Sequence, residues 1–125
     1  MSNRFLESID EGLRATDSAG VALTDIQEIT AEIKEALATK SKGMVSASLE
    51  DDDDFHVIMV ESDHDNITLC RLSPSDADGY PVIVRSSWLT SAMVCHDKEQ
   101  LVTQVSELLK DTRFAGALRR IMNPI

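Results

Sequence analysis

The sequence has few aromatic residues, few cysteines and few glycines. Its five glycines leave little material for a glycine-rich, phosphate-cradling loop. Phe, Trp and Tyr make up only 4% of the 125 residues, so the core must be mainly aliphatic. The two cysteines, Cys70 and Cys95, lie in apolar strand-like segments, and the amino terminus lacks a leader-like apolar stretch. Both features predict reduced thiols and a cytoplasmic protein.

Positive charge is also scarce. The sequence contains 12 Lys and Arg residues and 22 Asp and Glu residues, which gives a net charge of −10. A surface of this sign repels the phosphate backbone, so direct binding of nucleic acid is not expected. Apolar runs such as Val57 to Val60 are far shorter than the roughly 20 residues that cross a bilayer, which excludes membrane insertion.

Helical periodicity is present at both ends of the chain. Near the amino terminus, apolar residues recur at helical spacing, first at Phe5, Leu6, Ile9 and Leu13, and then, after a capping Thr24, at Ile26, Ile29, Ile33 and Leu37. Near the carboxyl terminus, Asp97 and Gln100 form a capping signature before a stripe that includes Leu101, Val105 and Leu108. A short last helix from about Thr112 ends before Pro124.

Between these helices the period changes to two. Phe55 to Val60 is the clearest strand, and because it is apolar on both faces it is expected to be an interior strand. Ile67 to Leu72 and Val82 to Val84 follow it, and Trp88 to Cys95 is a further candidate. The loop from Ser73 to Pro81 contains the Pro, Asp and Gly residues of a surface connection.

The order of these segments predicts one α+β domain over residues 1–125, since helices and strands are segregated along the chain. We expect a pair of amino-terminal helices at about 3–39, a three- to five-stranded antiparallel meander at about 44–95, and two carboxyl-terminal helices at about 98–123. No family resemblance is evident.

The most distinctive feature is acidic. Aspartates precede the strand at Phe55 and further carboxylates follow it, at opposite ends about 20 Å apart. A solvated loop is one interpretation, and a docking surface for a basic protein is the other. Trp88 is either a packed strand residue or a partner-binding anchor. The candidate partner-binding residues are Asp51, Asp52, Asp53, Asp54, Glu61, Asp63, Asp65 and Trp88.

The remaining reactive residues do not form a recognisable catalytic or metal motif. His56, His64 and His96 have no metal-binding spacing, although two of them lie beside acidic residues. Cys95 and His96 are adjacent, and neighbours on a strand point to opposite faces, so they cannot act as a nucleophile and base pair. We therefore expect no catalytic residue, no metal and no cofactor.

These observations favour a non-enzymatic protein that binds another protein, such as an inhibitor, an immunity factor or an accessory subunit. The alternative is a small-molecule or metal-binding domain that uses a sheet face and the histidines. Self-association is also considered, because the stripe Ile26, Ile29, Ile33 and Leu37 has the spacing of a helix-pair seam. The competing interpretation places this stripe on the protein's own sheet.

Overall fold

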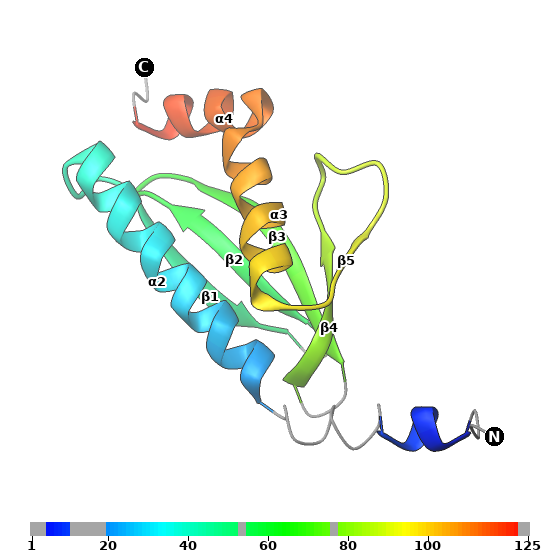
Figure 1. The fold of residues 1–125 in the computed structure, drawn as a ribbon. Coiled ribbons are helices and arrows are strands. Elements are labelled where there is room, and N and C mark those ends of the chain that lie inside the picture. Colours follow the sequence, from blue (N-terminus) through cyan, green and yellow to red (C-terminus); the bar gives the residue numbers. More distant parts are fainter. Residues whose placement is uncertain (1–4, 11–19, 53–54, 76–77, 123–125) are drawn as a thin grey trace.

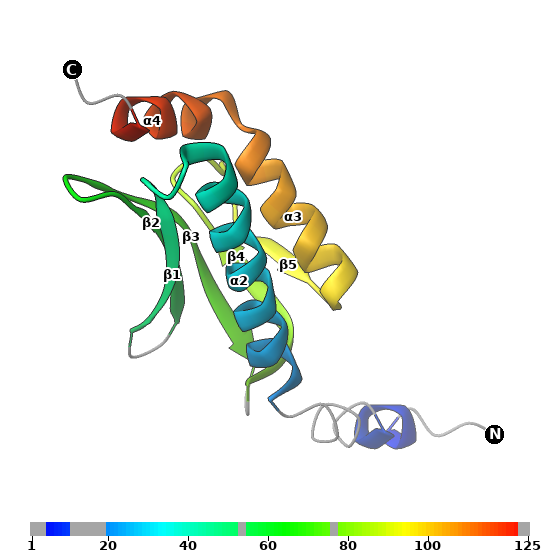
Figure 2. The same ribbon diagram turned by 90° about the vertical axis from the view of Figure 1, so that its left-hand side faces the viewer.

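The computed structural model describes residues 5–10, 20–52, 55–75 and 78–122. It consists of a five-stranded antiparallel sheet with helices on one face, as the side view in Figure 2 shows. This arrangement confirms the predicted α+β class with helices at both ends and a meander between them. The elements in chain order (Figure 1) are α1, described over residues 5–10, α2 (Val21–Ser41), β1 (Ser46–Asp51), β2 (His56–Glu61), β3 (Asn66–Ser75), β4 (Gly79–Arg85), β5 (Met93–Cys95), α3 (Lys98–Lys110) and α4 (Thr112–Met122).

The strands lie in the sheet in the order of the sequence, so each pairs with its neighbour in the chain. The register places Val60 beside Ala47 and Ile67 on the face that the helices cover. An irregularity between Ile58 and Met59 shifts the pairing of β2 with β3 by one residue. The prediction that β2 is an interior strand is confirmed.

Helix α2 packs its apolar stripe against the sheet. Ile26, Ile29, Ile33 and Leu37 are all buried in the same core cluster as the strand residues. These four side chains are therefore not available as the helix-pair seam that was considered, because the protein's own sheet already covers them. The competing interpretation, an intramolecular core, is correct.

The start of α2 also differs from the expectation. The helix begins at Val21 after Gly20, which has the left-handed φ of 78°, and not after Thr24. Thr24 lies inside the first turn, where its hydroxyl donates to the Gly20 carbonyl at 3.2 Å. The helix ends at Ser41, and Lys42 and Gly43, which follow it, both have the positive φ that is common after a helix C-terminus.

The first apolar stripe does not cover α2. Phe5, Leu6 and Ile9 are 65%, 58% and 59% exposed, while Leu13 lies outside the described residues. Figures 1 and 2 both place α1 beyond the amino-terminal end of α2, away from the sheet. The described residues of this stripe thus lie outside the buried core.

The carboxyl-terminal helices begin as the capping signature predicts. Asp97 Oδ1 accepts a hydrogen bond from the Gln100 backbone N–H at 2.8 Å, and Gln100 Oε1 accepts one from the His96 N–H at 2.7 Å. Leu101 and Leu108 of α3 are buried in the core, as is Phe114 of α4.

Two predicted boundaries in the sheet are wrong. The segment from Trp88 is not a strand until Met93, because residues 86–89 form a turn closed by a Leu89 N–H to Ser86 carbonyl bond. The loop predicted from Ser73 is shorter, since β3 continues to Ser75. Pro74 lies within this strand and pairs with Val82 of β4, next to an irregularity between Pro74 and Ser75.

Candidate functional site

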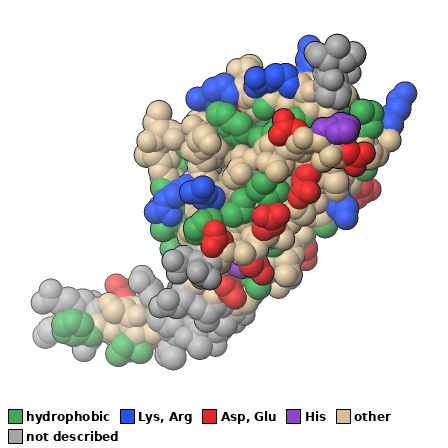
Figure 3. All heavy atoms as spheres, turned by 180° about the vertical axis from the view of Figure 1, so that it is seen from behind, with side chains coloured by type: hydrophobic (Ala, Val, Ile, Leu, Met, Phe, Trp, Pro, Cys, Tyr) green, Lys and Arg blue, Asp and Glu red, His purple; other side chains and the backbone are tan. Residues whose placement is uncertain are grey.

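The helices leave one face of the sheet uncovered, and this face is the candidate site. Strand alternation places Val57 of β2, Ile83 of β4 and Val94 of β5 on it, because their neighbours Ile58, Val84 and Cys95 point into the core. We call Val57, Met59, Ile83 and Val94 the apolar row. Strand β3 lies between β2 and β4 and contributes the polar residues Thr68, Arg71 and Ser73 to the same face, between the two halves of this row. Figure 3 views this side of the molecule and shows apolar side chains beside acidic and basic ones.

The first acidic segment lies at the hairpin between β1 and β2. Asp51 is the last residue of β1 and faces His56 across the strands, with 2.5 Å between Asp51 Oδ1 and His56 Nδ1. His56 Nε2 lies 4.0 Å from Asp78 Oδ1 on the other side. Asp52 closes the hairpin through backbone bonds with Phe55. Asp53 and Asp54 lie outside the described residues.

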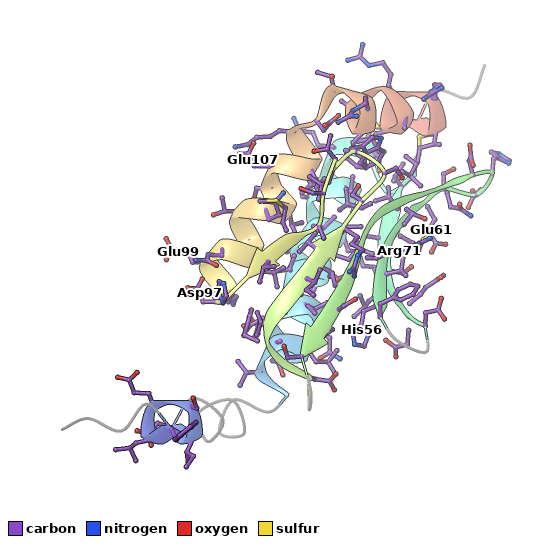
Figure 4. The ribbon with its side chains drawn as sticks, turned by 90° about the vertical axis from the view of Figure 1, so that its right-hand side faces the viewer. His56, Glu61, Arg71, Asp97, Glu99 and Glu107 are labelled. Atoms are coloured by element: carbon purple, nitrogen blue, oxygen red, sulfur yellow. The ribbon has the colours of Figure 1, made fainter. Side chains whose placement is uncertain are left out.

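The second acidic segment lies at the opposite end of β2, in the turn before β3. Asp63 and Asp65 are exposed, and the Asp65 carbonyl accepts a hydrogen bond from the Ser62 N–H at 2.9 Å. Glu61 is half-buried and accepts a hydrogen bond from the Ser48 hydroxyl at 2.6 Å. Figure 4 shows Glu61 and His56 at the two ends of the sheet. The described carboxylates thus lie at the two ends of β2 and do not form one pocket.

Trp88 is set apart from this face. Its ring makes an edge-to-face contact with buried Phe114, with 5.6 Å between ring centroids. Its carbonyl accepts a hydrogen bond from Arg113 Nη2 at 2.7 Å, and the same guanidinium pairs with Asp111. These contacts hold the β4–β5 connection against α4, so Trp88 packs within the protein, in a turn and not in the expected strand.

The histidines are dispersed over the described part of the chain. His56 and His64 lie at opposite ends of β2, and His96 precedes α3 beyond β5. Among the described residues, no group of three His, Cys, Asp or Glu side chains could hold a metal ion. The structure therefore does not bring together the ligands that the alternative of a metal-binding domain would use.

Both cysteines are buried and free. Burial raises the pKa of the Cys70 thiol to about 12. Burial, followed by the nearby Asp97 carboxylate, also raises the pKa of Cys95, which borders a surface hollow of about 620 Å³ between β5 and α3. A raised pKa disfavours the thiolate, so neither thiol is activated as a nucleophile.

Arg71 and Arg85 are the functional candidates that sequence reasoning missed. They lie directly opposite each other on β3 and β4, on the uncovered face. Figure 4 shows Arg71 on the sheet, well away from α3, which carries Glu99 and Glu107. Fourteen positions separate the two arginines in the chain, and only the register of the strands makes them neighbours.

Comparisons with protein-family models, with curated proteins and with solved structures find no match for this chain. Among the described residues, no helix is both long enough and apolar enough to cross a membrane.

Proposed function

We propose that the chain acts by binding another protein through the uncovered face of its sheet. The observation that supports this proposal is the apolar row. An antiparallel sheet that is solvated on one side usually has polar residues there. Here β2, β4 and β5 instead contribute Val57, Met59, Ile83 and Val94, of which Val94 is 50% exposed.

The acidic flanks define the charge of the partner. Asp51, Asp52, Asp63 and Asp65 are exposed at the two ends of the sheet, and Glu50 is exposed on β1. Opposite charges at the edge of an interface mainly raise the association rate, whereas desolvated apolar contacts slow dissociation. The proposed partner therefore presents an apolar patch flanked by Lys and Arg residues.

The experiment compares two matched variants. Met59→Asp combined with Ile83→Asp places charge in the apolar row, while Val102→Asp places charge on the helical layer, where Val102 is 37% exposed. Tagged proteins are used to recover partners from the native host, and each recovered protein is then purified and its affinity measured. We expect the parent and Val102→Asp to bind the same partner with equal affinity, and the row variant to bind at least about tenfold more weakly.

A partner that binds the row variant as tightly as the parent would refute the proposed surface. If Val102→Asp weakens partner binding as much as the row variant does, the proposed surface is also refuted. Circular dichroism on both variants separates lost binding from lost folding.

The role of the acid is tested by changing Asp51, Asp52, Asp53 and Asp54 to Asn together. If the carboxylates steer the partner, the association rate falls by about an order of magnitude at low salt and much less at high salt. A loss that does not depend on salt excludes steering. An affinity within about threefold of the parent assigns these residues to a solvated loop, since exposed charges usually contribute less than about 1 kcal/mol each.

A further inference from the structure

A second hollow lies on the uncovered face, where β3 and β4 pair. Its volume is about 360 Å³, and it is lined by Thr68, Arg71, Arg85, Ser86 and Ser87. Every one of these side chains carries an N–H or O–H group that can donate a hydrogen bond, and no carboxylate is among them. The hollow is thus lined by side-chain donors in a protein whose net charge is −10.

The two arginines lack a carboxylate partner within the described part of the chain. The ion pairs there involve His56, Lys98, Lys110 and Arg113 as the basic members. Like charges directly opposite each other weaken an antiparallel pair, so the Arg71–Arg85 arrangement costs stability unless an anion compensates it.

The nearest carboxylate on the same row of the sheet does not provide that compensation. Glu50 pairs with Val57, and Val57 pairs with Arg71, so Glu50 lies two strand spacings from Arg71. Two spacings amount to about 9.5 Å between the two backbones, and the ion pairs among the described residues include none between the Arg71 and Glu50 side chains. The arginines are therefore available to an external anion.

The surrounding contacts orient several of the donors. The Arg71 guanidinium lies over the Phe55 ring, 5.3 Å from its centroid. Ser86 Oγ accepts a hydrogen bond from the Trp88 N–H at 3.3 Å. The Ser86 hydroxyl proton can therefore still be donated to a ligand. Thr68 donates to the Met59 sulfur at 3.4 Å, a weak acceptor that a ligand oxygen can replace.

We propose that this hollow binds a phosphate group. Two guanidinium groups match the two negative charges of a phosphate monoester and can each bond it with two parallel N–H groups, while the three hydroxyls supply further donors. A carboxylate has one charge and two oxygens, so it leaves part of this donor set unsatisfied. The net charge of −10 repels a nucleic-acid polyanion and restricts the ligand to a single phosphate group on a small molecule or on a protein side chain.

The inference is independent of the protein-binding proposal and is tested by calorimetric titration of the whole protein with inorganic phosphate. We expect saturable binding by the parent. Arg71→Gln and Arg85→Gln should each weaken it by at least about tenfold, the effect of losing a charge-assisted hydrogen bond. Arg85→Lys keeps the positive charge but loses the two parallel N–H groups of the guanidinium. Its affinity for phosphate should lie between those of the parent and Arg85→Gln.

The control is Arg120→Gln, which removes the same charge from an exposed position on α4 and should leave the affinity unchanged. If this control loses as much affinity as Arg85→Gln, phosphate binding depends only on the net charge of the protein. That result would overturn the proposal. Absence of saturable binding by the parent at tens of millimolar phosphate would overturn it as well.

Thermal melting distinguishes a loss of phosphate affinity from misfolding of the arginine variants. Without phosphate, Arg85→Gln should melt at or above the temperature of the parent, because the substitution removes a repulsion. Phosphate should raise the melting temperature of the parent and not that of the variant. An equal rise in both proteins contradicts the assignment.

The source of the phosphate is distinguished by measuring the affinity for a short peptide with one phosphoserine and for the same peptide without the phosphate. Tighter binding of the phosphopeptide than of inorganic phosphate assigns the hollow to phosphorylated protein, and equal binding assigns it to a small molecule. Both results support a phosphate site, whereas equal binding of the two peptides argues against it.

Discussion

The packing of α3 on the sheet makes a quantitative prediction about Leu108. This residue is 2% exposed and belongs to the core cluster, whereas Val102, six positions earlier on the same helix, is 37% exposed. We expect Leu108→Ala to destabilise the protein strongly and Val102→Ala to have almost no effect. The two substitutions share a helix, so general damage to α3 would affect both.

The magnitude for Leu108 follows from the buried atoms. Removing three carbons at about 0.8 kcal/mol each gives about 2.4 kcal/mol of lost transfer free energy. A residual cavity adds to this, because the neighbouring elements relax only in part, and the total should lie between about 2.7 and 5 kcal/mol. For Val102→Ala, the smaller loss of burial is offset by the higher helix propensity of alanine, so we expect less than about 0.5 kcal/mol.

Urea denaturation followed by circular dichroism measures both values. The slope of the transition should be unchanged, so that the difference appears in the midpoint alone. A Leu108→Ala variant as stable as the parent would refute the placement of this face of α3 against the sheet. A large loss in Val102→Ala would show instead that the exposed side of α3 is covered by another copy or segment.

Three further predictions test other parts of the fold. Ile29→Glu should unfold the protein, because the residue is buried in the core, and circular dichroism measures the loss of structure. A folded, stable variant would show that this side of α2 is exposed to solvent. Hydrogen bonds from the Arg113 side chain hold the pKa of Asp111 at about 2, below its ordinary 3.8, so this carboxylate stabilises the fold above about pH 4 and loses its effect as the pH falls towards 2. Asp111→Asn should therefore lower the melting temperature at pH 7 and match the parent only below about pH 2, and a difference that persists there contradicts the assignment. Cys70 and Cys95 should react with iodoacetamide only in urea, and rapid labelling of the native protein would contradict their burial.

The helical parts of the fold were predictable because their signals are local. Asp97 and Gln100 lie three positions apart and form the cap that their spacing predicts. The segment from Trp88 to Cys95 was mistaken for a continuous strand because its structure depends on a distant contact. Trp88 packs against Phe114, 26 positions later, and no local propensity encodes that contact. The start of α2 was placed too late because Thr24 is an equally good cap by composition.

The candidate site was predictable only in its acidic part. A run of aspartates is visible in any sequence, whereas the apolar row depends on which side of each strand faces the helices. The shift between Ile58 and Met59 changes the pairing of β2 with β3, and no residue near it signals the change. The opposition of Arg71 and Arg85 depends instead on the register of β3 with β4, since one residue of slip would move one of them to the core face.

The two proposed functions of the uncovered face rest on separate observations, but the residues that carry them lie side by side. Ile83 of the apolar row lies two residues from Arg85 on the same face of β4, so a bound protein that covers the row also approaches the hollow. If the partner brings the phosphate, one contact surface supplies both apolar burial and neutralisation of the arginines. If the phosphate is a separate small molecule, it adds negative charge beside a surface that is already acidic at both ends, which favours the basic partner. Linkage then requires the partner to tighten phosphate binding by the same factor by which phosphate tightens the partner.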